Sequence, residues 1–180
     1  MSSVITEPET IALAEVDQHQ FNRAVWDRLS QDPVWVDLDY RIETDRHGQV
    51  IMSSPPAPAQ GNFQSEIVWH LKSLSQNGKV ITECPISTQE GVKAADVAWC
   101  SDPVWDSLGD ARFFVQCPEI VIEILSPSNT KGEIKEKIEL YFAGGAEEVW
   151  ICDNRGGMKF LIDSEERASS KRFPDFPQNI

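Results

Sequence analysis

Residues 118–128, with the sequence PEIVIEILSPS, are the most informative segment of the chain. Its isoleucine, valine and leucine residues, with a proline near each end, are typical of a central strand in an α/β sheet that is covered on both faces. Glu123 lies in the middle of this apolar run. Because a buried charge without a partner is costly, the Glu123 carboxylate needs a nearby cation or a change of protonation state. The candidate partners are a metal ion, a lysine, or both.

The length and composition predict one domain built around this strand. The chain has 180 residues, of which 41% are hydrophobic, and no linker or repeat divides it. We expect residues 1–36 to form an N-terminal helical extension and a strand. Residues 37–165 are then the core, and residues 166–180 are a C-terminal tail.

Two features of the sequence bear on the compartment. Residues 1–15 lack the basic start and apolar centre of a signal peptide, and no apolar run is long enough to cross a bilayer. We therefore expect a cytoplasmic protein that does not contact a membrane. The four cysteines are widely spaced and form no C-x-x-C pair, which favours buried free thiols over a zinc site or disulfides.

The chain is strongly acidic. Its 16 lysine and arginine residues stand against 29 aspartate and glutamate residues, which gives a net charge of −13. This sign opposes general attraction to nucleic acid, so binding to nucleic acid would require a local basic surface. The densest basic stretch contains Lys131, Lys135 and Lys137, directly after the Glu123 strand.

Hydrophobic periodicity and turn residues predict the remaining elements. Helices are expected at residues 17–29, 62–76 and 130–142. Strands are expected at residues 34–38 and 49–52, which a turn at His47 and Gly48 joins as a hairpin, and at residues 79–84, 86–89, 93–100, 148–153 and 158–162. Residues 53–58 and 101–111 are expected to be loops.

Two further acids interrupt apolar patterns. Asp96 lies in the predicted strand 93–100 among alanine, valine and tryptophan residues. Glu66 falls on the same predicted helix face as Phe63 and Ile67, so we expect it to point inward. His70 shares that face, and we interpret it as a partly buried histidine with satisfied hydrogen bonds.

A lysine is also predicted to point toward the sheet. Thr130 and Glu133 form the T-x-x-E pattern of a capping box, which predicts the start of a helix. Lys137 lies on the apolar stripe of that helix with Ile134 and Tyr141, whereas its charged neighbours point away. Three acids and one lysine in inward positions are the parts of a metal-dependent phosphodiesterase. Carboxylates are hard oxygen ligands for Mg²⁺, and a lysine can orient or help deprotonate the attacking water.

Five motifs resemble the Uma-two family of restriction endonucleases, which belongs to the PD-(D/E)XK nuclease superfamily. The motifs are MSSPP at residues 52–56, ADVA at 95–98, IVIEILSPS at 120–128, EKIELY at 136–141 and VWICD at 149–153. The resemblance covers nearly the whole chain. It implies a single nuclease-like domain with a restriction-endonuclease-like α/β fold, in which helices flank a mixed central sheet. It also implies hydrolysis of DNA phosphodiester bonds with Mg²⁺, for which Mn²⁺ can substitute, and a homodimer that cuts both strands.

The resemblance also implies a role for particular residues. Asp96 and Glu123 match the two metal-binding acids, the backbone carbonyl of Ile124 adds a ligand, and Glu66 is a supporting acid. The sequence departs from the family pattern at three positions: Ala95 replaces a proline, Leu125 replaces the lysine of the signature, and Gln60 replaces a histidine. Lys137 is the natural substitute for the missing lysine.

Three alternatives remain open. Glu123 and Lys137 can form a buried structural ion pair without any catalytic role. The whole protein can equally be a nuclease-fold binding or scaffold protein that is catalytically inactive, which the net charge of −13 favours. Glu66 can also be a solvated residue at a helix edge.

Overall fold

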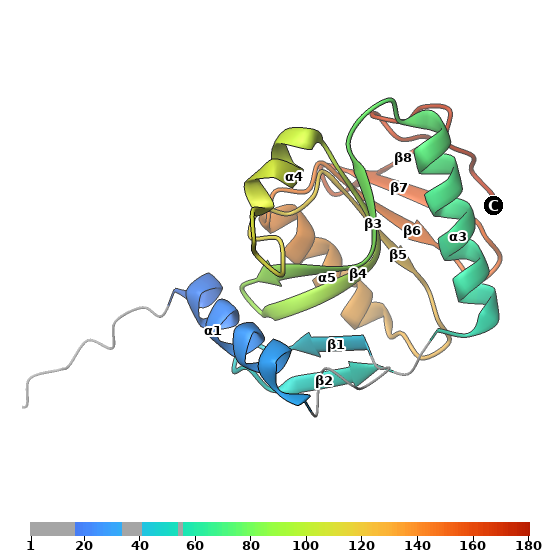
Figure 1. Ribbon diagram of the computed structural model, residues 1–180. Coiled ribbons are helices and arrows are strands. Elements are labelled where there is room, and N and C mark those ends of the chain that lie inside the picture. The colour runs from blue at the N-terminus through green and yellow to red at the C-terminus, as the bar shows by residue number, and fades with distance from the viewer. Residues whose placement is uncertain (1–16, 34–40, 54–55) are drawn as a thin grey trace, which may run out of the picture.

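The structure, a computed structural model, describes residues 17–33, 41–53 and 56–180. The strand predicted at residues 34–38 lies outside the described residues. A six-stranded sheet forms the centre of the molecule (Figure 1). In spatial order its strands are β3 (Lys79–Thr88), β4 (Gly91–Cys100), β5 (Ile120–Ile124), β6 (Glu148–Cys152), β7 (Met158–Ile162) and β8 (Glu165–Arg167).

The pairing of these strands makes the sheet mixed. Only β5 and β6 pair in parallel, and the other neighbours in the sheet are antiparallel. Helix α5 (Lys131–Ala143) is the crossover that a parallel pair requires. The structure therefore confirms the predicted α/β class with a mixed central sheet. The five residues of β5 are all buried, as the apolar run around Glu123 predicts.

Helices cover both faces of the sheet. Ile67 and Leu71 of α3 (Pro58–Leu74) pack with Ile122 and Trp150 on one face. Tyr141 of α5 and Val104 of α4 (Asp102–Leu108) belong to the cluster on the other face, which also holds Val121. Since side chains alternate along a strand, Glu123 shares the face of Val121 and points toward α5.

The N-terminal part of the described chain adds a helix and a hairpin. Helix α1 (Gln18–Gln31) is capped by Asp17, whose side chain accepts hydrogen bonds from two backbone amides, as predicted. Strands β1 (Arg41–Thr44) and β2 (Val50–Ser53) form an antiparallel hairpin beside β4. The predicted turn is confirmed, and Gly48 in it has a φ of 77°. The strand that pairs with β2 is β1, whereas the sequence predicts residues 34–38 as the partner.

The structure differs from the predicted elements in four main respects. Helix α3 begins at Pro58, four residues before the predicted start, because proline is well suited to the first helical position. Strand β3 is continuous through Pro85, which an edge strand tolerates because its ladder with β4 does not need the missing N–H; on the other side, the Pro85 carbonyl accepts a hydrogen bond from the amide of Phe114. The loop expected at residues 101–111 contains α4, which at seven residues is too short to show periodicity. Strand β8 was not predicted.

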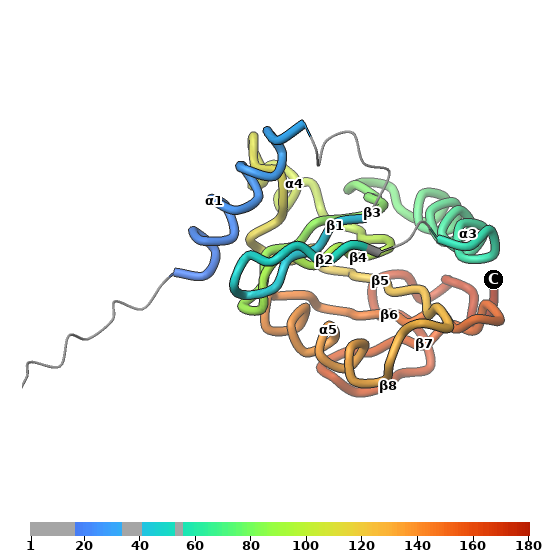
Figure 2. Tube along the Cα trace, turned by 90° about the horizontal axis from the view of Figure 1, so that it is seen from below, coloured from blue at the N-terminus to red at the C-terminus, as the bar shows by residue number. Residues whose placement is uncertain are grey.

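The C-terminal residues after β8 pack against the core. Phe173 and Phe176 are buried with Trp150 on the face that α3 covers, and Ile180 joins the same cluster. The C-terminus accordingly lies beside α3 in both views (Figures 1 and 2). All four cysteines are buried and free, as expected. In the part of the chain that the structure describes, no helix is long and apolar enough to cross a membrane.

Candidate active site

An open cleft of about 870 Å³ lies where the β1–β2 hairpin, the start of α3, the end of β5 and α5 meet. Acidic residues outnumber basic ones along its walls. The acidic residues are Glu43, Asp45, Glu83, Glu90, Asp96, Glu123, Glu133 and Glu136, and the basic residues are Arg41, Lys93 and Lys137. The cleft therefore contains three of the four side chains that the sequence predicts for the site.

Glu123 lies at the base of the cleft and is only 4% exposed. Its Oε1 accepts a 2.6 Å hydrogen bond from the hydroxyl of Tyr141 and lies 3.4 Å from Nζ of Lys137. Burial raises the pKa of Glu123 to about 7, with Lys137 opposing the rise and Asp96 adding to it. The predicted cationic partner of Glu123 is thus Lys137, and burial favours the protonated form of the acid.

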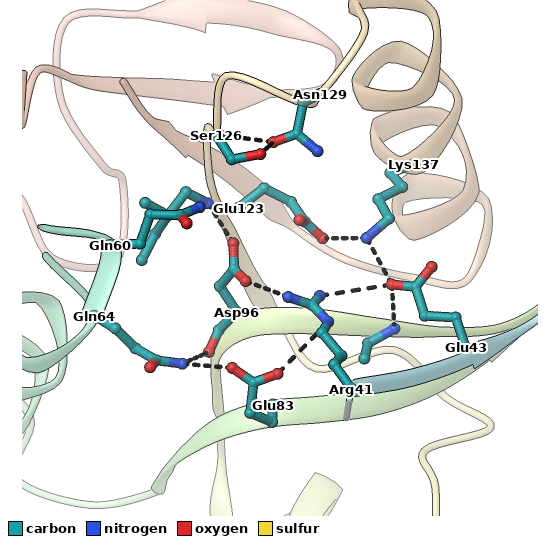
Figure 3. A network of polar contacts seen from close by, with 12 residues as sticks. Arg41, Glu43, Gln60, Gln64, Glu83, Asp96, Glu123, Ser126, Asn129 and Lys137 are labelled. Carbon is teal, nitrogen blue, oxygen red and sulfur yellow. Dashed lines mark hydrogen bonds and ion pairs between the residues drawn. The ribbon is translucent and has the colours of Figure 1, made fainter. Parts of the chain in front are cut away.

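Lys137 reaches this acid from α5. The capping box of Thr130 and Glu133 fixes where the helix begins, and the helix then directs Lys137 inward, as predicted. Its Nζ donates a 2.8 Å hydrogen bond to Oε1 of Glu43 (Figure 3). Burial alone would lower the pKa of Lys137, but the carboxylates of Glu123 and Glu43 outweigh burial and raise it. Lys137 is therefore a fixed positive charge rather than a base.

Asp96 lies beside the end of β5. Its Oδ2 accepts a 2.6 Å hydrogen bond from the backbone amide of Ile124, and its Oδ1 accepts a short hydrogen bond from Nη1 of Arg41. The side chain of Gln64 donates to the backbone carbonyl of Asp96 at 2.8 Å. The structure thus brings Asp96, Glu123 and Ile124 together, as expected, although Ile124 contacts Asp96 through its amide.

A break in strand alternation helps to form this part of the site. Thr82 pairs with Val97 and Cys84 with Ala95, so Glu83 lies opposite Asp96. Glu83 has a φ of 49°, a left-handed conformation that is costly for a residue with a side chain. The side chain of Glu83 accepts a 2.9 Å hydrogen bond from Gln64 and lies near Arg41.

Arg41 and Glu43 are the main site residues that the sequence analysis missed. They lie two positions apart on β1, and Nη2 of Arg41 is 3.6 Å from Oε1 of Glu43. Glu43 also accepts a 3.1 Å hydrogen bond from the backbone amide of Ala94, which ties β1 to β4. The alternation of polar and apolar residues in RIET, residues 41–44, is the signal that could have located this strand.

Glu66 does not belong to this cluster. Its side chain is exposed on α3 and does not line the cleft. Gln64, two positions earlier and therefore about 200° around the helix, faces the site instead. The inward placement predicted for Glu66 is wrong. Gln60, at the position of the family's histidine, lines the cleft and accepts a hydrogen bond from the amide of Ala57.

His70 lies outside the cleft. Its ring packs edge-on against Phe176, with 5.5 Å between the ring centres, and against Trp69. This packing agrees with a histidine of structural role.

The donors in the cleft suit a divalent cation in their chemistry but not in their present arrangement. Carboxylate oxygens are the ligands that Mg²⁺ prefers. Among the residues that the structure describes, however, no three histidine, cysteine, aspartate or glutamate side chains are placed to hold one ion. The guanidinium of Arg41 lies between the carboxylates of Asp96, Glu43 and Glu83 (Figure 3).

Comparison with known proteins identifies the family and supports the fold. The Uma2 family model, described as "Putative restriction endonuclease", matches residues 26–172. A crystal structure of a "putative nuclease belonging to DUF820" from Anabaena variabilis has a TM-score of 0.62 and 17% sequence identity. The match covers 76% of this chain and 85% of that chain, and at this identity it shows the fold alone. No curated protein matches the chain. The family match extends over most of the sequence, and the chain therefore belongs to the Uma2 family, as its motifs indicate.

Proposed function

We propose that the protein is a Mg²⁺-dependent endonuclease that hydrolyses DNA phosphodiester bonds in this cleft. The observation that carries the proposal is the contact of Lys137 with Glu123, at 3.4 Å, beside Asp96. These are the positions that the family motifs assign to the two acids, with the lysine supplied from α5 instead of β5. The family and the fold support a nuclease, and the excess of carboxylates over basic side chains in the cleft supports the metal requirement.

Asp96 and Glu123 are the residues that would hold the ion, with the Ile124 carbonyl as an additional ligand. A bound Mg²⁺ would polarise the phosphate and neutralise the charge that develops during hydrolysis. Mn²⁺ would substitute, because it accepts the same oxygen ligands. Glu66 has no place in this arrangement, because its side chain is exposed outside the cleft.

Lys137 is proposed to hold the attacking water and to stabilise negative charge on the phosphate. Its two carboxylate partners, Glu43 and Glu123, fix the position of the ammonium and keep it protonated. Because the ammonium is in place before the reaction, no reorganisation is needed when negative charge develops on the phosphate, and the ammonium can stabilise that charge. The mechanism assigns no proton abstraction to Lys137.

The acidic cleft makes a cation necessary for substrate binding. The carboxylates that line it would repel a phosphate diester unless a metal ion and Lys137 offset their charge. Cleavage of both strands of a duplex requires two such sites, so we propose that the active form is a homodimer.

A plasmid-nicking assay tests the proposed function. The parent protein should nick supercoiled DNA with Mg²⁺ or Mn²⁺ and should be inactive with EDTA. Asp96→Asn and Glu123→Gln should both abolish nicking. Glu139→Gln is a matched control, because Glu139 is exposed on α5 and pairs only with Lys135 among the interactions described. Nicking that survives EDTA, or that both site variants retain, would contradict the proposal.

The alternative is a nuclease-fold binding or scaffold protein without catalysis. Arg41 favours it, since this residue already neutralises Asp96, and so does the net charge of −13. A protein of this kind would bind no divalent cation in a calorimetric titration and would leave plasmid DNA intact under all conditions.

A further inference from the structure

Arg41 occupies the centre of the carboxylate cluster (Figure 3). Its Nη1 donates to Asp96, its Nε lies 3.5 Å from Glu83, and its Nη2 lies 3.6 Å from Glu43. The guanidinium therefore lies among the carboxylates that the proposed function assigns to a cation. Four acids and two bases meet here, namely Glu43, Glu83, Asp96 and Glu123 with Arg41 and Lys137.

Asp96 has no carboxylate oxygen without a partner. Oδ2 is bound by the amide of Ile124, and Oδ1 is bound by Arg41. The Ile124 amide is part of β5 and cannot move away without disturbing the sheet. Arg41, in contrast, contacts Asp96 through its side chain alone, so this contact is the one that can be exchanged without moving the backbone.

The hydrogen bonding of the guanidinium is incomplete. Nε and Nη2 are buried, and neither has a hydrogen-bond partner of good geometry within the described residues. Buried donors of this kind are costly, and leaving the cluster for the open cleft would return them to water. The side chain lines that cleft and is 19% exposed, so it has a route outward.

The fold of the hairpin does not depend on this guanidinium. Strand β1 is joined to β4 by the hydrogen bond from the Ala94 amide to Glu43 and by one from the Val92 amide to Thr44. Neither bond involves the side chain of Arg41. Arg41 thus acts on the charge of the site rather than on the connection between β1 and β4.

We propose that Arg41 is the resident counter-ion of the acidic cluster, and that a divalent cation must displace it from Asp96 in order to bind. The inference rests on the proposed function, because it concerns the same metal. A divalent cation and the Arg41 guanidinium repel each other when both approach the same carboxylate oxygen, which disfavours their binding together. The apparent affinity for metal is therefore reduced by the fraction of molecules in which Arg41 has left Asp96.

Calorimetric titration of Mn²⁺ into the parent protein, Arg41→Gln and Arg46→Gln tests the proposal. Arg46 is the matched control: it lies in the turn of the same hairpin, pairs with Glu90 at 3.3 Å and carries the same charge. If Arg41 leaves Asp96 in about a tenth of molecules or fewer, Arg41→Gln should bind Mn²⁺ at least about tenfold more tightly. Arg46→Gln should bind like the parent protein, within about twofold, because exposed charges are well screened.

The outcomes separate this inference from the proposed function. The inference is supported if Arg41→Gln binds Mn²⁺ more tightly than the parent protein and Arg46→Gln does not. This result supports displacement even if the parent protein binds no Mn²⁺ that can be detected. Equal or weaker binding by Arg41→Gln overturns the inference, while metal binding by the parent protein leaves the proposed function standing. A lack of binding by all three proteins overturns both.

A second measurement needs no variant, in case Arg41→Gln does not fold. The Nε–H signal of Arg41 can be followed by NMR in the ¹⁵N-labelled parent protein during a Mg²⁺ titration. Displacement predicts that this signal shifts and exchanges faster with water, while the signal of Arg46 stays in place. An Arg41 signal that is unchanged when Mg²⁺ is saturating overturns the inference.

Discussion

The hydroxyl of Tyr141 donates a 2.6 Å hydrogen bond to Oε1 of Glu123, and both side chains are almost completely buried. The bond joins α5 to β5 at the base of the cleft. It leaves Glu123 facing Lys137, whose Nζ approaches the same oxygen at 3.4 Å. Tyr141 is therefore a positioning residue for the acid that the proposed mechanism uses.

Removal of this hydroxyl should destabilise the protein. Tyr141→Phe keeps the ring but leaves Glu123 with one partner fewer in a buried position. Hydrogen bonds to charged groups contribute about 1.5–3 kcal/mol, so we expect a loss of this order in the free energy of unfolding. Urea denaturation at pH 8, where Glu123 is ionised, measures it. An unchanged midpoint would show that the bond does not contribute to stability.

The raised pKa of Glu123 predicts how stability depends on pH. Its pKa is about 7 in the folded protein and about 4.5 in the unfolded chain. The folded state therefore binds more protons between these values, so the contribution of Glu123 is full below pH 4.5 and is lost as the pH rises through 7. The total change is about 3 kcal/mol, since one pKa unit corresponds to about 1.4 kcal/mol.

Glu123→Gln is the variant that isolates this effect. Between pH 5 and about 8, its free energy of unfolding should change less with pH than that of the parent protein, because the variant lacks the titrating group. Chemical denaturation at several pH values provides the comparison. Parallel curves for the two proteins would assign the pH dependence to other groups.

Divalent cations should raise the thermal stability. A ligand that binds only the folded state stabilises it by about 2.7 kcal/mol at a hundredfold excess over its Kd. Differential scanning fluorimetry with millimolar Mn²⁺ should therefore show a higher melting temperature. Asp96→Asn should remove the response to Mn²⁺. If Mn²⁺ leaves the melting temperature of the parent protein unchanged, metal binding is contradicted.

Lys137 and Lys135 provide a matched pair for the proposed mechanism. Lys137→Ala should lower the rate of nicking by about 10²–10³, as removal of one preorganised charge does elsewhere. Lys135 is exposed and pairs only with Glu139 at 3.6 Å in the described structure, so Lys135→Ala should change the rate little. Lys137→Ala also removes the lysine partner of two buried carboxylates, Glu43 and Glu123, and should therefore destabilise the protein. Rates are for this reason compared per folded molecule.

A double variant tests where the charge must lie. Lys137→Ala combined with Leu125→Lys returns an ammonium to the position of the family signature, next to the end of β5. Partial recovery of nicking would show that the location of the charge matters rather than the element that carries it. If Lys137→Ala alone nicks DNA as well as the parent protein, Lys137 is a structural residue.

The sequence by itself determined the elements whose signals are local. The apolar run around Glu123 is typical of a buried strand, and the apolar stripe of Ile134 and Tyr141 on α5 predicts that Lys137 faces the sheet. Asp96 was found in the same way, as an acid within an apolar strand. The motifs in these elements also identified the family.

Only the tertiary structure decided which groups complete the site. The alternation in residues 41–44 can locate the strand that carries Arg41 and Glu43, but it cannot show which residues the strand meets, and Glu43 contacts Lys137 across 94 positions of sequence. The face that α3 turns to the cleft depends on packing against the sheet and the C-terminal residues, so Gln64 and not Glu66 points inward. Periodicity describes one element at a time, whereas the charge balance around Asp96 arises where several elements meet.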